Sequence, residues 1–242
     1  MAIEVFNRYE NKYMLSKETF EKFIPVISRY MTCDTHNISG NTYTISNIYY
    51  DTDDDYLIRT SISKPKYKEK LRLRAYGVPE LSSKVFLEIK KKYKGKVNKR
   101  RTGLTLGEAY EFLSTGRAPN PKGYMNKQVL REIEYFLEVY NPKPKAYIAY
   151  DRIAFFAKDN PDLRVSFDTN IRTRRYDLDL SKGDYGEKLL DEDIYLMEIK
   201  TYLAMPVWLA DALAKFNIKP KSFSKYGTEY KKHINSSLHN AI

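Results

Sequence analysis

Apolar and polar residues alternate with a period of two in several segments, which predicts β-strands that have one apolar and one charged face. In KLRLRAYG, Leu71 and Leu73 share one face, and Arg72 and Arg74 share the other. The charged faces of the other predicted strands carry Arg8, Glu10 and Lys12; Glu88 and Lys90; Lys99 and Arg101; Arg152; Arg164, Ser166, Asp168, Asn170, Arg172 and Arg174; and Glu198 and Lys200.

Helices are predicted between some of these strands, where apolar residues recur at helical spacing. The expected starts are marked by N-capping residues or proline, and the expected ends by glycine or proline. We expect helices after Ser16, after Thr105, around Val129–Tyr140, from Pro206 and, as a short C-terminal helix, after Gly227. Pro25 should distort or divide the first of them, and the apolar faces should pack in the core.

The charged strand faces allow two arrangements. In an open antiparallel sheet they would face solvent, and this is the commoner case for any single strand. Here the faces are rich in arginine, and a Glu-x-Lys pair recurs at Glu10, Glu88 and Glu198. We therefore predict an α+β fold in which about eight antiparallel strands close into a barrel, with helices outside and charges lining a tunnel. Residues 1–242 are expected to form one such domain.

Composition points to a polyanionic ligand. Lys and Arg outnumber Asp and Glu by 42 to 31, which gives a net charge of +11. Such an excess attracts nucleic acid, anionic lipid or phosphate-rich metabolites, although a solvated basic surface would have the same composition. Cys33 is the only cysteine, and no signal segment or apolar membrane span is evident, so a cytoplasmic location is expected.

A tunnel lined by many cations would need an anionic content, because like charges in a low-dielectric space repel one another. A string of phosphates fits this need, since Arg binds phosphate oxygens by forked hydrogen bonds and Lys by point charge. Glutamates facing phosphate would be repelled unless a divalent cation lay between them. The pattern therefore predicts Mg²⁺ or Mn²⁺ at Glu10, Glu88 and Glu198.

The motifs together resemble the VTC domain, the polyphosphate polymerase branch of the triphosphate tunnel metalloenzyme superfamily. They occur in family order: RYENKY, IYYDT, LRLRAYG, FLEIKKK, VNKRR, AYDRIAF, LRVSFDT, LMEIK and SFSKYGTEY. The resemblance spans the chain from Phe6 to Tyr230 and implies an eight-stranded antiparallel tunnel. It also implies transfer of the ATP γ-phosphate onto a polyphosphate chain.

Site residues follow from this resemblance, motif by motif. Those expected to act on phosphate are Lys12, Arg72, Arg74, Lys90, Lys99, Arg152, Arg164, Lys200 and Lys225. Further substrate contacts are expected from Arg8, Arg101, Arg172, Arg174 and Ser224, and metal binding from Glu198, Glu10 and Glu88. One departure is Arg8, which replaces the first Glu of the superfamily's E-x-E-x-K motif. This change weakens the case for a two-metal hydrolytic site.

Alternatives remain open on the residues alone. The same tunnel with water as nucleophile would be a tripolyphosphatase or nucleoside triphosphatase, and without turnover it would be a polyphosphate-binding module. The basic run EIKKKYKGKVNKRR could contact nucleic acid, but its cations alternate in strands and no nucleic-acid motif is present, so no nucleic-acid partner is expected. Its Lys91, Lys92, Lys94 and Lys96 form either a solvated hairpin or a tunnel mouth. Association with a separate membrane protein is possible.

Overall fold

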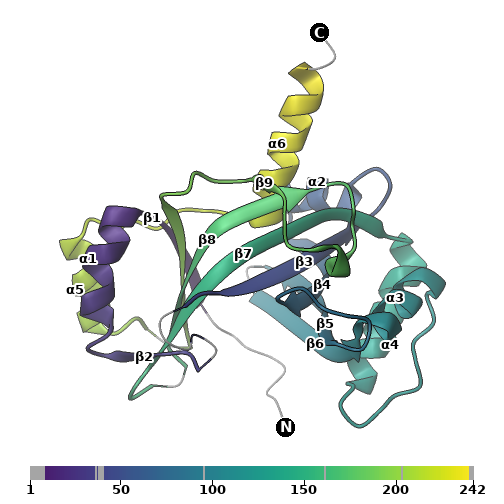
Figure 1. Cartoon of the computed structure of the whole chain (residues 1–242), viewed down its shortest axis with the longest axis horizontal. Helices are drawn as coiled ribbons and strands as arrows, with labels where there is room; N and C mark the ends of the chain where they lie inside the picture. The colour runs from purple at the N-terminus through teal and green to yellow at the C-terminus, as the bar shows by residue number, and fades with distance from the viewer. Residues whose placement is uncertain are drawn as a thin grey trace.

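The protein is built around one strongly curled antiparallel sheet (Figure 1). The structure is a computed structural model that describes residues 9–35, 37, 41–94, 96–160, 162–202 and 204–239. Its strands are β1 Tyr9–Ser16, β2 Met31–Cys33, β3 Tyr43–Asp51, β4 Tyr67–Tyr76, β5 Lys84–Tyr93, β6 Lys96–Thr105, β7 Lys143–Ala157, β8 Arg164–Arg174, β9 Glu187–Lys188 and β10 Ile194–Thr201. Its helices are α1 Lys17–Ile27, α2 Tyr56–Ile62, α3 Leu106–Thr115, α4 Lys127–Tyr140, the 3₁₀ turn η2 Leu180–Lys182, α5 Val207–Lys215 and α6 Lys225–His239.

The sheet is an open half-barrel, so the predicted closed barrel is wrong. The main strand order is β1-β10-β8-β7-β3-β4-β5-β6, and β1 and β6 do not pair within the described residues. The outer edge of β1 is instead occupied by the segment before α6. Tyr13 forms a bridge with Pro220, and the backbone N–H of Lys221 donates to the carbonyl of Lys12 at 2.7 Å. Because this segment caps β1, the ladder cannot continue to β6.

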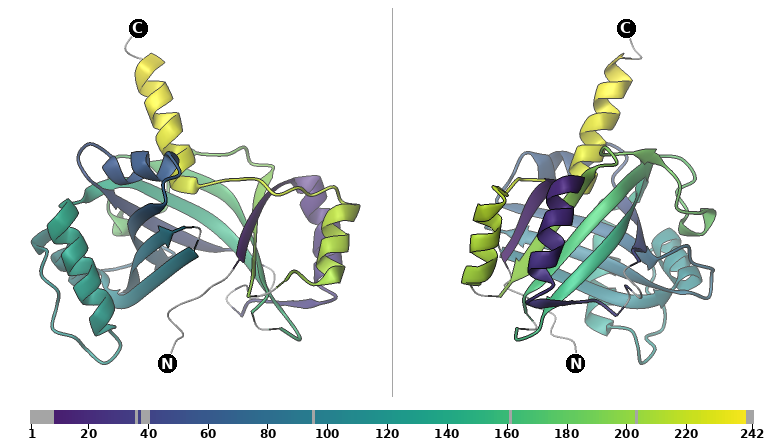
Figure 2. Two further views of the ribbon diagram at one scale, coloured as in Figure 1. Left: turned by 180° about the vertical axis from the view of Figure 1, so that it is seen from behind. Right: turned by 60° about the vertical axis from the view of Figure 1, so that its left-hand side comes forward.

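Three hydrophobic clusters distinguish the outer face of the sheet from its inner face. Two lie on the outer face, one under α3 and α4 and the other under α1 and α5 (Figure 2). The third lies on the inner face, where Ile45, Ile148 and Tyr150 pack against Ile58 of α2 and Tyr226 of α6. The charged strand positions therefore face the hollow of the sheet, as the alternation predicted, and α2 and α6 cover one end of it.

Helix boundaries follow the expected capping chemistry. The Ser16 hydroxyl accepts from the N–H of Thr19, and Thr105 and Glu108 form a complete capping box. Gly116 ends α3 in the left-handed conformation, at φ 73°. Pro25 lies inside α1, which continues for only two residues beyond it.

The C-terminal helix differs from its prediction. It begins at Lys225 rather than after Gly227, and it runs for 15 residues. Its first turn is buried, whereas residues 231–238 are exposed and project away from the sheet (Figure 1). Two polar contacts hold the buried part: Tyr226 donates to Asp51 at 3.1 Å, and Arg175 forms a bidentate pair with Glu229.

A β-bulge in β8 divides that strand into two parts. Asn170 has φ 47°, and the register with β7 shifts by one residue at this point. Before the bulge, Asp168 lies opposite Arg152 on the inner face. After it, Arg172 lies opposite Ala149, which belongs to the outer-face cluster under α3 and α4. The predicted polar row is thus continuous in sequence but changes sides in space.

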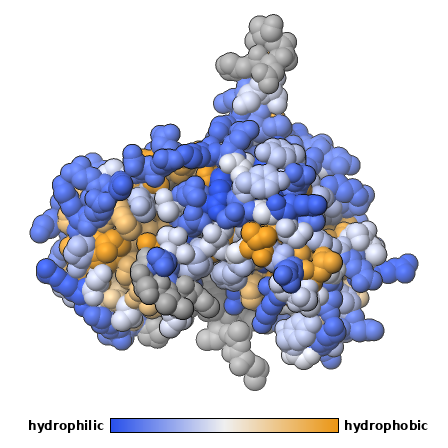
Figure 3. Space-filling view, in the orientation of Figure 1, coloured by the Kyte–Doolittle hydropathy of each residue, from blue (hydrophilic) through white to orange (hydrophobic). Residues whose placement is uncertain are grey.

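The surface seen in Figure 3 is largely hydrophilic, with smaller apolar patches. In the part of the chain that the structure describes, no helix combines the length and apolarity needed to cross a lipid bilayer.

Candidate phosphate-binding site

The hollow of the half-barrel opens into a basic cavity of about 700 Å³. Residues of β1, β4, β5 and β6 and the segment before α6 line it together, so the two ends of the open sheet face one another across it. Its lysines are Lys12, Lys64, Lys68, Lys70, Lys90, Lys92, Lys221 and Lys231, against the single carboxylate Glu10. This imbalance of charge suits a polyanionic ligand and disfavours a cationic one.

Glu88 of β5 is the centre of a cation cluster on the inner face. Its side chain is 1% exposed and accepts from the Nε of Arg72 at 2.6 Å. The Nζ of Lys99 lies 2.8 Å from it, and Nη1 of Arg74 lies at 3.9 Å. The facing positions of β4, β5 and β6 create this cluster, since Arg72 is the β4 register partner of Glu88 and Lys99 lies two residues before its β6 partner, on the same face. Three cations around one carboxylate leave an excess of positive charge.

A second cluster surrounds Asp168 of β8 and Glu198 of β10. Arg152 donates to both carboxylate oxygens of Asp168, at 2.6 and 2.8 Å, and Lys225 of α6 donates to Asp168 as well. Four cations lie within 4 Å of Glu198, which is 8% exposed: Lys200 at 3.3 Å, Lys12 at 3.4 Å, and Arg152 and Lys225 at 3.7 Å. Lys225, the first residue of α6, thereby lies next to β8 and β10, which are distant from it in sequence.

Electrostatics keeps the carboxylates of both clusters ionised. Burial alone would raise the pKa of Glu198, but the four surrounding cations lower it well below its usual value. Burial would also raise the pKa of Glu88, and Arg72, Arg74 and Lys99 together lower it well below the usual range. Both groups are therefore anions at neutral pH.

Two lysines of the inner face have strongly lowered pKa values. Burial and the charges of Arg72 and Arg74 lower the pKa of Lys99, against the opposite effect of Glu88, to about 7. Burial likewise lowers the pKa of Lys70 to about 8, with Lys90 acting in the same direction. Cations held in this state gain from an incoming anion, which would relieve their mutual repulsion.

Comparison with known proteins agrees with this geometry. The sequence profile described as the VTC domain matches residues 7–234. The chain belongs to the VTC domain family. It is 27% identical over 214 residues to the vacuolar transporter chaperone complex subunit 4 of Trypanosoma brucei brucei. That alignment covers 74% of this chain but 27% of the relative, so this VTC domain spans about a quarter of the relative's length.

Solved structures show the same fold at lower identity. A putative adenylate cyclase from Bacillus halodurans superposes with a TM-score of 0.56 and 17% identity, over 92% of this VTC domain and 96% of that chain. A putative adenylyl cyclase from Hippeastrum, described as having a dominant triphosphatase activity, superposes with a TM-score of 0.54 and 15% identity, over 92% and 95% of the two chains. The VTC domain therefore shares the fold of these two proteins, here as a half-barrel.

Most of the predicted site residues come together in this VTC domain. The two clusters contain Arg72, Arg74, Lys99, Glu88, Lys12, Arg152, Glu198, Lys200 and Lys225. Glu10 and Lys90 line the cavity between them, and Ser224 accepts from the N–H of Gly227 beside Lys70. Arg101 and Arg164 lie on the inner face but outside both clusters. Arg8 lies outside the described residues.

Arg172 and Arg174 do not reach the site. The bulge at Asn170 turns them to the outer face, so the expectation that they share the row of Asp168 is wrong. Arg172 pairs there with Asp151 at 3.2 Å and Asp184 at 2.6 Å. The guanidinium of Arg174 lies 3.6 Å from the ring centroid of Tyr147. Both arginines brace the segment after β8 instead of facing the cavity.

Sequence reasoning missed two buried tyrosines that hold the arginines. The hydroxyl of Tyr49 accepts from Arg72 at 3.2 Å, and that of Tyr150 accepts from Arg74 at 3.0 Å. Tyr150 stands two residues before Arg152 and shares its face, so strand alternation could have identified it. The same applies to Lys68 and Lys70, which precede Arg72 on the inner face of β4.

The lysine-rich β5–β6 hairpin serves both sides of the sheet. Lys92 lines the cavity, whereas Lys91 lies on the outer face near Glu132 of α4, at 3.6 Å. Lys94 and Lys96 are exposed. Lys92 thus lies at the cavity, as a tunnel mouth would require, whereas Lys94 and Lys96 are solvated. Lys91 differs from Lys92 because successive side chains of a strand point to opposite faces.

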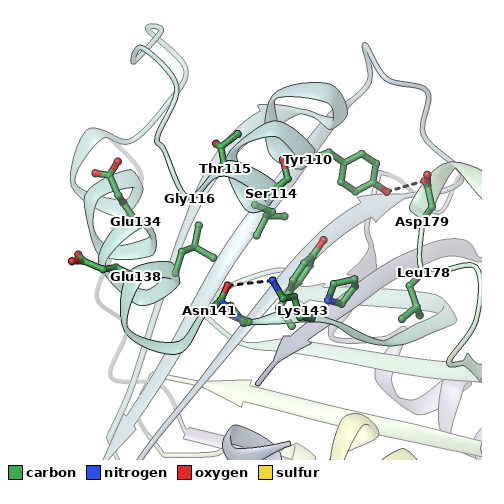
Figure 4. Close-up of a pocket in the computed structure, with 15 residues that line it drawn as sticks. Tyr110, Ser114, Thr115, Gly116, Glu134, Glu138, Asn141, Lys143, Leu178 and Asp179 are labelled. Carbon is green, nitrogen blue, oxygen red and sulfur yellow. Dashed lines mark hydrogen bonds between the residues drawn. The ribbon is translucent and has the colours of Figure 1, made fainter. Parts of the chain in front are cut away.

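A second cavity of about 980 Å³ lies on the outer face, between α3, α4 and the segment before η2 (Figure 4). Tyr110 donates to Asp179 at 2.8 Å at one end of it, and Lys143 to Asn141 at the other. Its ionisable residues are Glu134, Glu138, Asp179 and Lys143. With acids in excess, it does not suit a chain of phosphates.

Proposed function

We propose that this VTC domain is a polyphosphate polymerase that transfers the γ-phosphate of ATP onto a polyphosphate chain. The observation that carries the proposal is the pair of cation clusters around Glu88 and Glu198 on the inner face of the sheet, together with the basic cavity that Lys12 of the second cluster lines. The family relative supports it, because that relative is a subunit of a vacuolar transporter chaperone complex. Association of this chain with such a complex is part of the proposal.

The first role of the site is to hold a triphosphate. Arg72 and Arg74 present forked donors from neighbouring inner positions of β4, and Tyr49 and Tyr150 fix their planes. Lys70 and Lys90 add point charges on the same side of the cavity. Because these groups are already positioned, little side-chain entropy would be lost on binding.

The second role is to stabilise charge during transfer. An oxygen of the acceptor's terminal phosphate would form a bond to the γ-phosphorus, while the bond from that phosphorus to the β–γ bridging oxygen breaks and ADP leaves. Arg152, Lys12 and Lys225, which lie within 4 Å of Glu198, would neutralise the equatorial oxygens. The acceptor oxygen is already ionised, so no general base is required. This fits a site without a histidine among its described residues.

A divalent cation fits Glu10 and Glu198 but not Glu88. The charge of Glu198 acts on Glu10, so the two carboxylates are neighbours, and both have lowered pKa values, against the effect of burial. Mg²⁺ and Mn²⁺ commonly use one or two carboxylates together with substrate phosphates and water. No group of three metal-ligating side chains occurs in the described part of the chain, so phosphate oxygens would complete the shell. Arg72 and Lys99 contact Glu88 at 2.6 and 2.8 Å, whereas every cation near Glu198 lies at 3.3 Å or more, so we leave Glu88 out of the metal site. When bound, the metal would withdraw charge from the phosphate oxygens.

The activity is tested by incubating the protein with ATP and Mn²⁺ and separating the products by length. We expect phosphate chains longer than tripolyphosphate together with ADP, and no chains when a chelator is added. Orthophosphate and ADP alone would indicate a triphosphatase. Binding of polyphosphate without turnover would indicate a binding module.

Glu198→Gln should lower the rate of chain synthesis by about a hundredfold or more, because it removes one carboxylate charge from the proposed metal site. The matched control is Glu111→Gln at an exposed position of α3, which should retain the wild-type rate. Circular dichroism would establish that both variants are folded. A wild-type rate in Glu198→Gln would refute the metal role assigned to this residue.

Binding of tripolyphosphate should weaken as pH rises through about 7, because the pKa of Lys99 lies at about 7 and only its protonated form attracts phosphate. Titration of the ligand itself contributes to any such profile, so the comparison is with Lys99→Met. We expect the variant to bind more weakly than wild type at about pH 6 and to lose less affinity between about pH 6 and pH 8. Calorimetry at several pH values measures both slopes, and identical slopes would contradict the assignment.

A further inference from the structure

Three aromatic residues lie at the strand ends beyond the arginines, and we call Tyr43, Tyr76 and Phe86 the aromatic rim. The ring centroids of Tyr43 and Tyr76 are 6.0 Å apart, and those of Tyr76 and Phe86 are also 6.0 Å apart, with the latter pair edge to face. Strand register places all three on the inner face. Tyr43 is opposite Arg152, and Phe86 is opposite Arg74.

The rim is cationic as well as aromatic. The guanidinium of Arg101 lies 4.8 Å from the ring centroid of Phe86. Arg164 donates to the hydroxyl of Tyr43 at 3.4 Å. These are the two predicted site arginines that lie on the inner face outside both cation clusters. Arg164 also pairs with Asp34 at 3.6 Å, which helps to hold it beside Tyr43.

Core packing explains only one member of the rim. Tyr43 packs against the inner hydrophobic cluster, whereas Tyr76 and Phe86 belong to none of the three clusters, and the Tyr76 side chain is 48% exposed. A half-exposed aromatic side chain loses little apolar surface to the protein itself. It gains more from a flat ligand that covers it.

The rim adjoins the arginines in register. Tyr76 follows Arg74 by two residues on β4, and Phe86 precedes Glu88 by two on β5. Two residues of a strand span about 7 Å. Lys70, which lines the basic cavity, lies on the other side of the arginines along β4. The inner face therefore changes from lysines through arginines to aromatic rings along one direction.

We propose that the aromatic rim binds the base of the nucleoside triphosphate, with the γ-phosphate directed toward the lysines. The inference rests on the proposed function, since it assumes a triphosphate at Arg72 and Arg74. A base has a flat face that stacks on aromatic rings and on guanidinium planes, as in other nucleotide-binding surfaces. A bare polyphosphate chain has no such face and gains nothing from the rings. The rim thus selects the donor nucleotide, and the lysine-lined cavity takes the polymer.

The test compares ATP with tripolyphosphate, which carries the same phosphates without a base. By calorimetry, Tyr76→Ala and Phe86→Ala should each weaken ATP binding about tenfold and leave tripolyphosphate binding unchanged. Tyr76→Trp keeps a ring at the rim and should retain ATP affinity. Tyr135→Ala is the matched control, because Tyr135 is 66% exposed on α4 and lies away from the inner face.

Ethenoadenosine triphosphate gives an independent readout, since stacking quenches its fluorescence. We expect quenching by the wild-type protein and by Tyr135→Ala, and a loss of quenching in Tyr76→Ala. Equal weakening of ATP and tripolyphosphate, or no weakening of either, would overturn the role of the rim while leaving the phosphate site intact. A wild-type protein that binds neither ligand would instead overturn the proposed function.

Discussion

Asp168→Ala should lower the free energy of unfolding by about 3–5 kcal/mol, because it removes the nearer of two carboxylates that neutralise Arg152 and Lys225 and leaves only Glu198, at 3.7 Å from each. Asp168 is completely buried and lies between Arg152 and Lys225, which are themselves nearly buried. Urea unfolding followed by circular dichroism measures the change. The matched control is Asp211→Ala at an exposed position of α5, which should alter stability by less than about 0.5 kcal/mol.

The pH dependence of stability gives a second measurement of the same cluster. Arg152 and Lys225 lower the pKa of Asp168 against the effect of burial. Its contribution to stability is therefore complete above the unfolded-state pKa of about 4 and declines as pH falls toward the lower folded-state value. Asp168→Ala should lack this part of the acid transition. If Asp168→Ala lowered the free energy of unfolding by less than about 1 kcal/mol at neutral pH, the ion cluster would not be needed for the stability of the fold.

Arg74→Ala should reduce the rate of polyphosphate synthesis by about 10²–10³, the usual effect of removing one donor that stabilises transition-state charge. The Arg74 guanidinium is held in a fixed orientation by Asn47 at 2.9 Å and by Tyr150 at 3.0 Å. Product chains resolved on a gel and ADP release both measure the rate.

Arg74→Lys separates charge from geometry. It retains the positive charge but loses the planar fork, and we expect it to remain at least about tenfold below wild type. Arg131→Ala, at an exposed position of α4, is the matched control and should be fully active. Full activity in Arg74→Ala, with the protein folded, would exclude Arg74 from the transfer site.

Local patterns predicted the inner and outer faces of the sheet well. On β4, the period of two separates Leu71 and Leu73, which pack under α3 and α4, from Arg72 and Arg74, which lie around Glu88 on the inner face. The capping box at Thr105 and Glu108 likewise marks the start of α3. These features depend on residues close in sequence, so they can be predicted without knowledge of the fold.

Long-range features could not be predicted in this way. The open sheet results from the pairing of β1 with Pro220 and Lys221, which lie more than two hundred residues further along the chain. No pattern within β1 indicates this contact. The two partners of Asp168 show the same limit, since Arg152 is its strand neighbour but Lys225 arrives with α6. Lys225 was predicted as a site residue from the family resemblance, because the alternation of residues within strands could not identify it.

The bulge also escaped prediction, because alternation assumes extended backbone at every position. Asn170 adopts the left-handed conformation, which Asn tolerates better than most residues. The polar residues before and after it therefore look like one row in the sequence. Only the register with β7 shows that they belong to different faces.

One extra residue at Asn170 thus decides which side chains the end of β8 presents to each face. If β8 ran fully extended with Asn170 retained, Arg172 and Arg174 would turn into the apolar inner cluster near Ile148, and Ile171 would move outward. Deleting Asn170 would instead remove the bulge and leave Ile171 inside and both arginines outside. Related chains are therefore expected either to keep both the extra residue and its left-handed conformation or to lack both.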